Sequence, residues 1–216
     1  MAKKLIFLDF EGFENKHPSL VGFLNKGEFN QIILDKAFRA ISDATDIDFL
    51  EFKVFCNFIS QICLNENAFI ASYSSLEQKV ITEELQRDIP FIDLRIQIKK
   101  MVNRNHSEEH KTMKEYWAGQ RYLRNGNLNP HHNPYNKKRW KLLTILKLFD
   151  YPEINTSYGD RKVTKRLRDV VSGLKARGSY EMLTPVQKSK WTKLLKHNYV
   201  DVMGLDYLLQ KLDIEI

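Results

Sequence analysis

Cysteine is scarce in this chain, since Cys56 and Cys63 are the only two among its 216 residues. Two cysteines in one helical-looking segment provide neither a disulfide framework nor the four thiolates of a structural zinc site. We therefore predict a reducing compartment, the cytoplasm. Long apolar runs are missing as well, because no stretch approaches the roughly 18 uncharged apolar residues that a membrane span needs. The sequence thus predicts no transmembrane segment.

Glycine and proline are too few for a fibrous or proline-rich chain, at nine and six residues. Core-forming side chains are plentiful, with 43% hydrophobic and 12% aromatic residues, which excludes intrinsic disorder. The length predicts a single domain over residues 1–216 with an elaboration at about 99–160. We expect the opening segment, MAKKLIFLDFEGF, to form a first strand and not a signal peptide, because an acid interrupts it at position 9.

Positive charge is concentrated in one part of the chain. The net charge is +7, but the stretch 99–147 holds twelve Lys and Arg against three Glu, so the remainder sums to −2. Aromatic residues are interleaved with these basic residues, and such rings stack on unpaired bases while cations neutralise phosphates. We therefore predict a nucleic-acid partner, with candidate contacts at Arg121, Arg124, Lys137, Lys138, Arg139 and Trp140. The alternative is a solvated face whose aromatic side chains point into the core.

Hydrophobic periodicity predicts an α/β domain with a mixed sheet. Apolar runs at 3–9 and 67–73 indicate buried strands, and two short runs around Asn25-Lys26-Gly27 indicate a hairpin over 19–35. A long amphipathic helix is expected after Thr45, with Thr45 and Asp48 as its capping pair. Further helices are expected at 75–87, 107–123, 136–149, 163–176 and from Thr184, with a strand-to-helix corner at 91–98 and a loop at 125–136.

The end of the first predicted strand carries two acids on one face. Asp9 and Glu11 are two residues apart, so strand alternation points both to the same side, opposite Phe10. Two neighbouring carboxylates repel each other unless a proton or a cation lies between them. A hard divalent cation with oxygen ligands would remove that repulsion. The alternative is an exposed strand end at which both acids are solvated.

Two later segments add acids beside buried elements. Glu77 falls in the first turn of the helix that follows strand 67–73, where the helix N-terminus favours an acid in any case. His197 and Asp201 are four residues apart and share a face if the last helix includes both. A histidine one turn from a buried acid can serve as a general base beside a metal ligand, and the alternative is a surface ion pair.

In this order, the three segments resemble the motifs of the DEDD superfamily of 3′–5′ exonucleases. The strand ending in Asp9 and Glu11 matches the D-x-E of the first motif, and SYSSLE aligns with the second, H-N-x-x-F-D, with Glu77 replacing the final Asp. HNYVD aligns with the third, Y-x-x-x-D, with His197 in place of the Tyr and Asp201 as the acid. KHNYVDVMGLDYLL is also similar to the Y-N-x-x-D-V ending of a poorly characterised bacterial branch.

The resemblance implies a ribonuclease H-like fold, a mixed sheet flanked by helices, and hydrolysis of phosphodiester bonds of DNA or RNA at single-stranded 3′ ends. It further implies a two-metal mechanism with Mg²⁺ or Mn²⁺. Asp9, Glu11 and Asp201 would hold the first ion, Asp9 would bridge to the second, and Glu77 would reach the second directly or through water. His197 would be the base or would position the water.

Other interpretations remain open. The departures at Glu77 and His197 favour an alternative, a non-catalytic nucleic-acid-binding module on a decayed nuclease fold. Asp93 is an extra acid that could approach the site. His106 and His110 fit the H-x-x-E-H spacing of some zinc peptidases, but their segment is polar and lacks an apolar helix face.

Overall fold

The computed structural model describes residues 3–13, 17–112, 140–154 and 163–214, and a mixed sheet forms its centre. The strand order is β4-β3-β2-β1-β5-β6. β1 (Lys4–Gly12) pairs antiparallel with β2 (Pro18–Asn25), which pairs antiparallel with β3 (Glu28–Ile33). β5 (Ala68–Ser72) runs parallel to β1 and to β6 (Phe91–Asp93), and β4 (Asp48–Phe49) runs parallel to β3. The predicted α/β class with a mixed sheet is confirmed.

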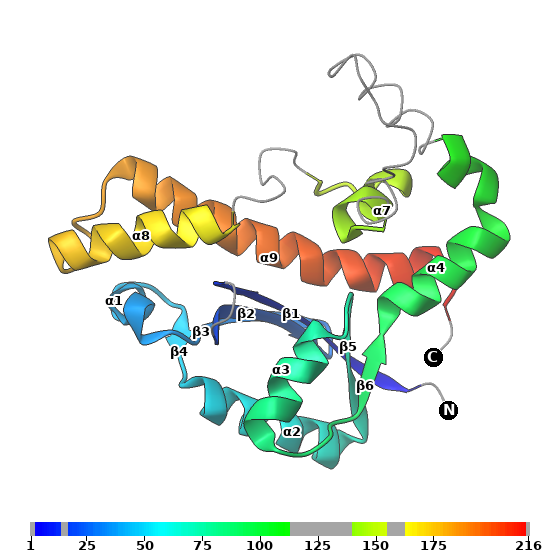
Figure 1. Ribbon diagram of the computed structural model, residues 1–216, viewed down its shortest axis with the longest axis horizontal. Coiled ribbons are helices and arrows are strands. Elements are labelled where there is room, and N and C mark those ends of the chain that lie inside the picture. The colour runs from blue at the N-terminus through cyan, green and yellow to red at the C-terminus, as the bar shows by residue number, and fades with distance from the viewer. Residues whose placement is uncertain (1–2, 14–16, 113–139, 155–162, 215–216) are drawn as a thin grey trace, which may run out of the picture.

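Helices cover both faces of this sheet (Figure 1). They are η1 (Lys36–Phe38), α1 (Arg39–Ser42), α2 (Phe52–Glu66), α3 (Leu76–Leu85), α4 (Leu94–Asn105), α7 (Leu142–Leu148), α8 (Val163–Arg177) and α9 (Pro185–Lys211). In the described part of the chain, no helix combines the length and apolarity that crossing a membrane would require.

Alternation along β1 divides the core into two sides. Ile6 and Leu8 pack with residues of α2 and α3, whereas Phe7 packs with residues of α4, α7 and α9. β2 is buried along nearly its whole length, as expected for a strand covered on both faces. The same alternation turns Asp9 and Glu11 toward the side on which α9 lies.

Local sequence signals explain the turns and caps that were predicted. Lys26 and Gly27 both have positive φ, 52° and 82°, which makes the two-residue turn that joins β2 to β3. The capping box of α9 is present, because Thr184 Oγ1 accepts from the Gln187 backbone N–H and the Gln187 side chain accepts from the Thr184 backbone N–H. The predicted corner at 91–98 is the junction of β6 with α4.

The predicted start of the long helix after Thr45 is wrong. Asp48 and Phe49 pair with Ile32 and Ile33 as β4, and α2 begins only at Phe52. Thr45 instead donates to the Ile41 carbonyl at 2.8 Å, at the end of α1. Strand pairing at the sheet edge therefore overrides helical periodicity. The predicted helix 107–123 is helical over 107–112, and its remainder, the loop 125–136 and the start of helix 136–149 lie outside the described residues.

Candidate metal centre

β1 and α9 contribute the central groups of the candidate site. Glu11 is 7% exposed and lies where β1 ends, next to an irregularity in the pairing with β2. His197 and Asp201 are one turn apart in α9, the long helix that runs along the sheet (Figure 1). His197 Nε2 lies 3.6 Å from Glu11 Oε1 and 3.8 Å from Asp201 Oδ2. One nitrogen of the imidazole therefore lies near two carboxylates that come from different elements.

Glu77 is brought to the site by the β5–α3 junction. Its side chain is 7% exposed, and Ser72 and Ser74 place their hydroxyls 3.0 and 2.9 Å from Oε2. Burial raises the pKa of Glu77, while hydrogen bonds from its own backbone, Ser74 and Ser72 oppose that rise. Asp93, the register partner of Ser72 in β6, raises the pKa of Glu77 further through like-charge repulsion. Asp93 thus lies within electrostatic range of the site.

The four predicted acids act on one another. Burial is the main cause that raises the pKa of Asp9 well above its usual range, followed by repulsion from Glu11, Asp201 and Glu77. Burial also raises the pKa of Glu11, again followed by repulsion from Asp201 and Glu77. The pKa of Asp201 is raised by burial and lowered by His197. The fold therefore gathers carboxylates whose ionised forms are mutually unfavourable.

A cation outside the three motifs acts on this cluster. Arg166 of α8 is 5% exposed, and its charge lowers the pKa of Glu11. Burial lowers the pKa of Arg166 itself, and Glu11 opposes that effect. A buried arginine on a helix face that also carries Leu167 and Val170 is a departure from the apolar pattern that sequence analysis could have noticed.

Among the described residues, Glu11, His197 and Asp201 form a set that could hold a metal ion, with ligand atoms that all lie within 4.8 Å of one another. Two carboxylate oxygens and one imidazole nitrogen suit a divalent ion such as Mn²⁺, whereas Mg²⁺ prefers oxygen ligands. His197, predicted as a base, is therefore also a possible ligand. Asp9 and Glu77 are not members of this compact set.

Asn198 is a buried polar residue to which sequence analysis gave no role, although it falls on the Asn of the Y-N-x-x-D-V pattern. It is fully buried, and its Nδ2 lies 2.9 Å from Asp9 Oδ2 and 3.0 Å from the Asp9 carbonyl. Gln31 of β3 donates to Asn198 Oδ1 at 3.0 Å. A second signal was its place on the apolar stripe of α9 that includes Leu194 and Val202, because such a position normally holds an apolar side chain.

The predicted nucleic-acid contacts Arg121, Arg124, Lys137, Lys138 and Arg139 lie outside the described residues. Trp140, the sixth, is 7% exposed and belongs to the core beside α4 and α7. Its ring lies 4.6 Å from that of His110, and Lys99 Nζ lies 5.3 Å from its centroid. Little of the Trp140 ring is therefore exposed for a nucleic-acid base to stack on. At this residue the structure agrees with the alternative, in which the aromatic side chains of the basic stretch point into the core.

The zinc-peptidase spacing does not assemble a site in the described part of the chain. His106 packs edge-on against Phe149, and Glu109 lies 3.9 Å from His106. His110 is buried against Trp140. Neither histidine belongs to a group of potential metal ligands there.

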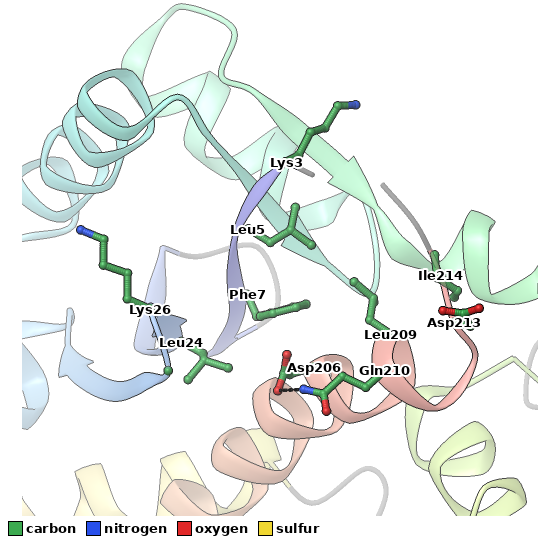
Figure 2. A pocket seen from close by; sticks show the side chains of 11 residues that line it. Lys3, Leu5, Phe7, Leu24, Lys26, Asp206, Leu209, Gln210, Asp213 and Ile214 are labelled. Carbon is green, nitrogen blue, oxygen red and sulfur yellow. Dashed lines mark hydrogen bonds between the residues drawn. The ribbon is translucent and has the colours of Figure 1, made fainter. Parts of the chain in front are cut away.

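A hollow of about 600 Å³ lies at the other end of β1 (Figure 2). Leu5, Phe7 and Leu24 line it from the sheet, together with Asp206 and Leu209 from α9. None of the predicted acids lines this hollow, so the candidate metal centre and the hollow are separate features.

Comparisons with known proteins give no significant match: no protein-family model, no curated protein and no solved structure matches this chain.

Proposed function

We propose that this protein is a divalent-metal-dependent 3′–5′ exonuclease that hydrolyses phosphodiester bonds of DNA or RNA with two Mg²⁺ or Mn²⁺ ions. One observation carries the proposal: Asp9, Glu11, Glu77, His197 and Asp201 come from β1, α3 and α9, far apart in the sequence, and yet interact electrostatically at one place. The residues that gather there are those of the three sequence motifs. A ribonuclease H-like fold, also part of the proposal, agrees with a mixed sheet flanked by helices.

The electrostatics of the acids support a cation in this site. Asp9, Glu11, Glu77 and Asp201 all have raised pKa values, with burial as the largest cause. Burial and mutual repulsion disfavour the ionised forms of these acids, and positive charge placed among them favours those forms. A bound divalent ion would supply this charge and would also polarise a phosphodiester for attack by water. Glu11 and Asp201 would hold one ion, with His197 either as a third ligand or as the base beside it. Asp9 and Glu77 would contribute carboxylate oxygens to the pair of ions.

The position of His197 suits a general base. If it is not bound to metal, its Nε2 can accept a proton from an attacking water. The imidazolium that results would lie 3.6 Å from the Glu11 carboxylate and 3.8 Å from that of Asp201, which stabilises its charge. Ser72 and Ser74, in the β5–α3 junction, orient the Glu77 carboxylate through its Oε2.

The decisive experiment follows the degradation of DNA and RNA oligonucleotides labelled at the 5′ or the 3′ end, with Mn²⁺, Mg²⁺ or EDTA. We expect 5′-labelled substrates to shorten progressively, 3′-labelled substrates to release labelled mononucleotide at once, and EDTA to stop both reactions. Asp201→Asn is the inactive control for contaminating nucleases, because it removes a carboxylate of the candidate metal set. Binding without any metal-dependent shortening would overturn the proposal and favour the non-catalytic binding module.

A further inference from the structure

A buried amide pair connects α9 to the sheet next to the acidic site. Asp9, Gly22 and Gln31 are register partners across β1, β2 and β3, so they form one row on the α9 side of the sheet. Asn198 lies over the middle of this row, where a Cβ on Gly22 would be 2.1 Å from its Oδ1. Glycine at position 22 therefore provides the space that the Asn198 amide fills.

The hydrogen bonds of this pair have one consistent direction. The Leu195 carbonyl can only accept, so Gln31 must turn its Nε2 toward it, at 3.0 Å. The second N–H of Gln31 then donates to Asn198 Oδ1, also at 3.0 Å. Asn198 is thereby forced to present its Nδ2 to Asp9, where one N–H donates to the backbone carbonyl and the other to Oδ2. A flipped Asn198 would place oxygen against oxygen at both contacts.

We infer that Asn198 and Gln31 are positioning residues that fix the side-chain orientation of Asp9 for metal binding, an inference that rests on the proposed function. Asn198 binds one oxygen of the Asp9 carboxylate, Oδ2, and leaves Oδ1 outside this hydrogen-bond chain. The hydrogen-bond partners of a metal ligand hold that ligand in its orientation, and removing them typically lowers metal affinity by about 10- to 100-fold.

Packing alone does not account for an amide at position 198. A leucine would fill the same space above Gly22, match the apolar neighbours on α9 and avoid the desolvation of a polar group. What leucine lacks is a donor for Asp9. The function of the amide is therefore the direction of its hydrogen bonds, which Gln31 controls.

Two nearly isosteric variants separate orientation from packing. Gln31→Glu removes both donors of the Gln31 side chain, and Asn198→Leu removes those of Asn198. Gln61→Glu and Asn57→Leu are matched controls, because both residues are exposed on α2, which packs on the side of the sheet opposite α9. Circular dichroism checks that all four variants fold.

The primary measurement is the Asp9 rotamer in metal-free protein, from three-bond NMR couplings about χ1. We expect one rotamer in the wild type and in both controls, and averaged couplings in Gln31→Glu and Asn198→Leu. Electron paramagnetic resonance of free Mn²⁺ should then show affinity reduced by about 10- to 100-fold in the same two variants.

The outcomes distinguish this inference from the proposed function. Unchanged Asp9 couplings in both variants overturn the positioning role. Averaged couplings with undiminished Mn²⁺ affinity overturn its connection to the metal. If the couplings average but the wild type itself binds no Mn²⁺, the positioning of Asp9 stands and the proposed metal-dependent function fails.

Discussion

Replacing Asp9 by asparagine should make the metal-free protein more stable while it abolishes hydrolysis. Burial is the largest cost of ionising Asp9, and repulsion from Glu11, Asp201 and Glu77 adds to it. Asparagine keeps the shape and an oxygen for the Asn198 donor but removes the negative charge. The three remaining acids then ionise more easily, because each loses one like-charged neighbour.

The gain in stability follows from two opposing contributions. Holding an insufficiently paired ion in a low-dielectric site costs several kcal/mol, even after relaxation. The hydrogen bond from Asn198 to the ionised Asp9 carboxylate stabilises the wild type by about 1.5–3 kcal/mol. The Asp9→Asn variant loses part of this stabilisation, because its amide oxygen is neutral. We therefore expect a net gain of about 1–3 kcal/mol near neutral pH. For a chain of 216 residues this corresponds to a rise in Tm of about 2–12 °C.

Thermal unfolding in EDTA, followed by circular dichroism, measures this gain. Asp88→Asn is the matched control, because Asp88 is an exposed acid for which the same change should leave Tm unchanged. Saturating Mn²⁺ should reverse the order: about 2.7 kcal/mol is gained at 100 times the Kd, and Asp9→Asn should gain less than the wild type. An Asp9→Asn protein that is less stable than the wild type in EDTA at about pH 7 would refute the electrostatic argument.

Three further predictions concern pH, His197 and salt. The pKa values of Asp9, Glu11, Glu77 and Asp201 are raised, so the folded state binds more protons than the unfolded chain; urea unfolding in EDTA should show stability falling as the pH rises above about 4 and through the folded-state pKa values. His197→Ala should cut the hydrolytic rate by about 10²–10⁴-fold with little change in KM, and His197→Tyr should retain more activity; wild-type rates for the alanine variant would exclude His197 as base. Affinity for single-stranded oligonucleotides should fall with salt, with a log–log slope of about −0.7 per phosphate contacted, and a salt-insensitive affinity would argue against the basic stretch 99–147 as the binding region.

Local signals were sufficient for much of the fold. The apolar run of β1, the Lys26-Gly27 turn and the Thr184–Gln187 capping box each depend on residues close together in the chain, so their chemistry alone predicts them. The start of α2 could not be predicted in this way. Asp48 and Phe49 carry a helical pattern but pair with β3, and only the position of the sheet edge decides between the two.

The candidate residues of the site follow from local patterns: strand alternation puts Asp9 and Glu11 on one face, and helical spacing puts His197 and Asp201 one turn apart. That the two pairs meet depends on the packing of α9 beside β1, which brings His197 Nε2 within 3.6 Å of Glu11 Oε1. The role of Asn198 depends on the same packing, because its partners Gln31 and Asp9 are 167 and 189 residues away in the chain. Hydrogen bonds over such separations depend on packing between elements, which no local pattern records.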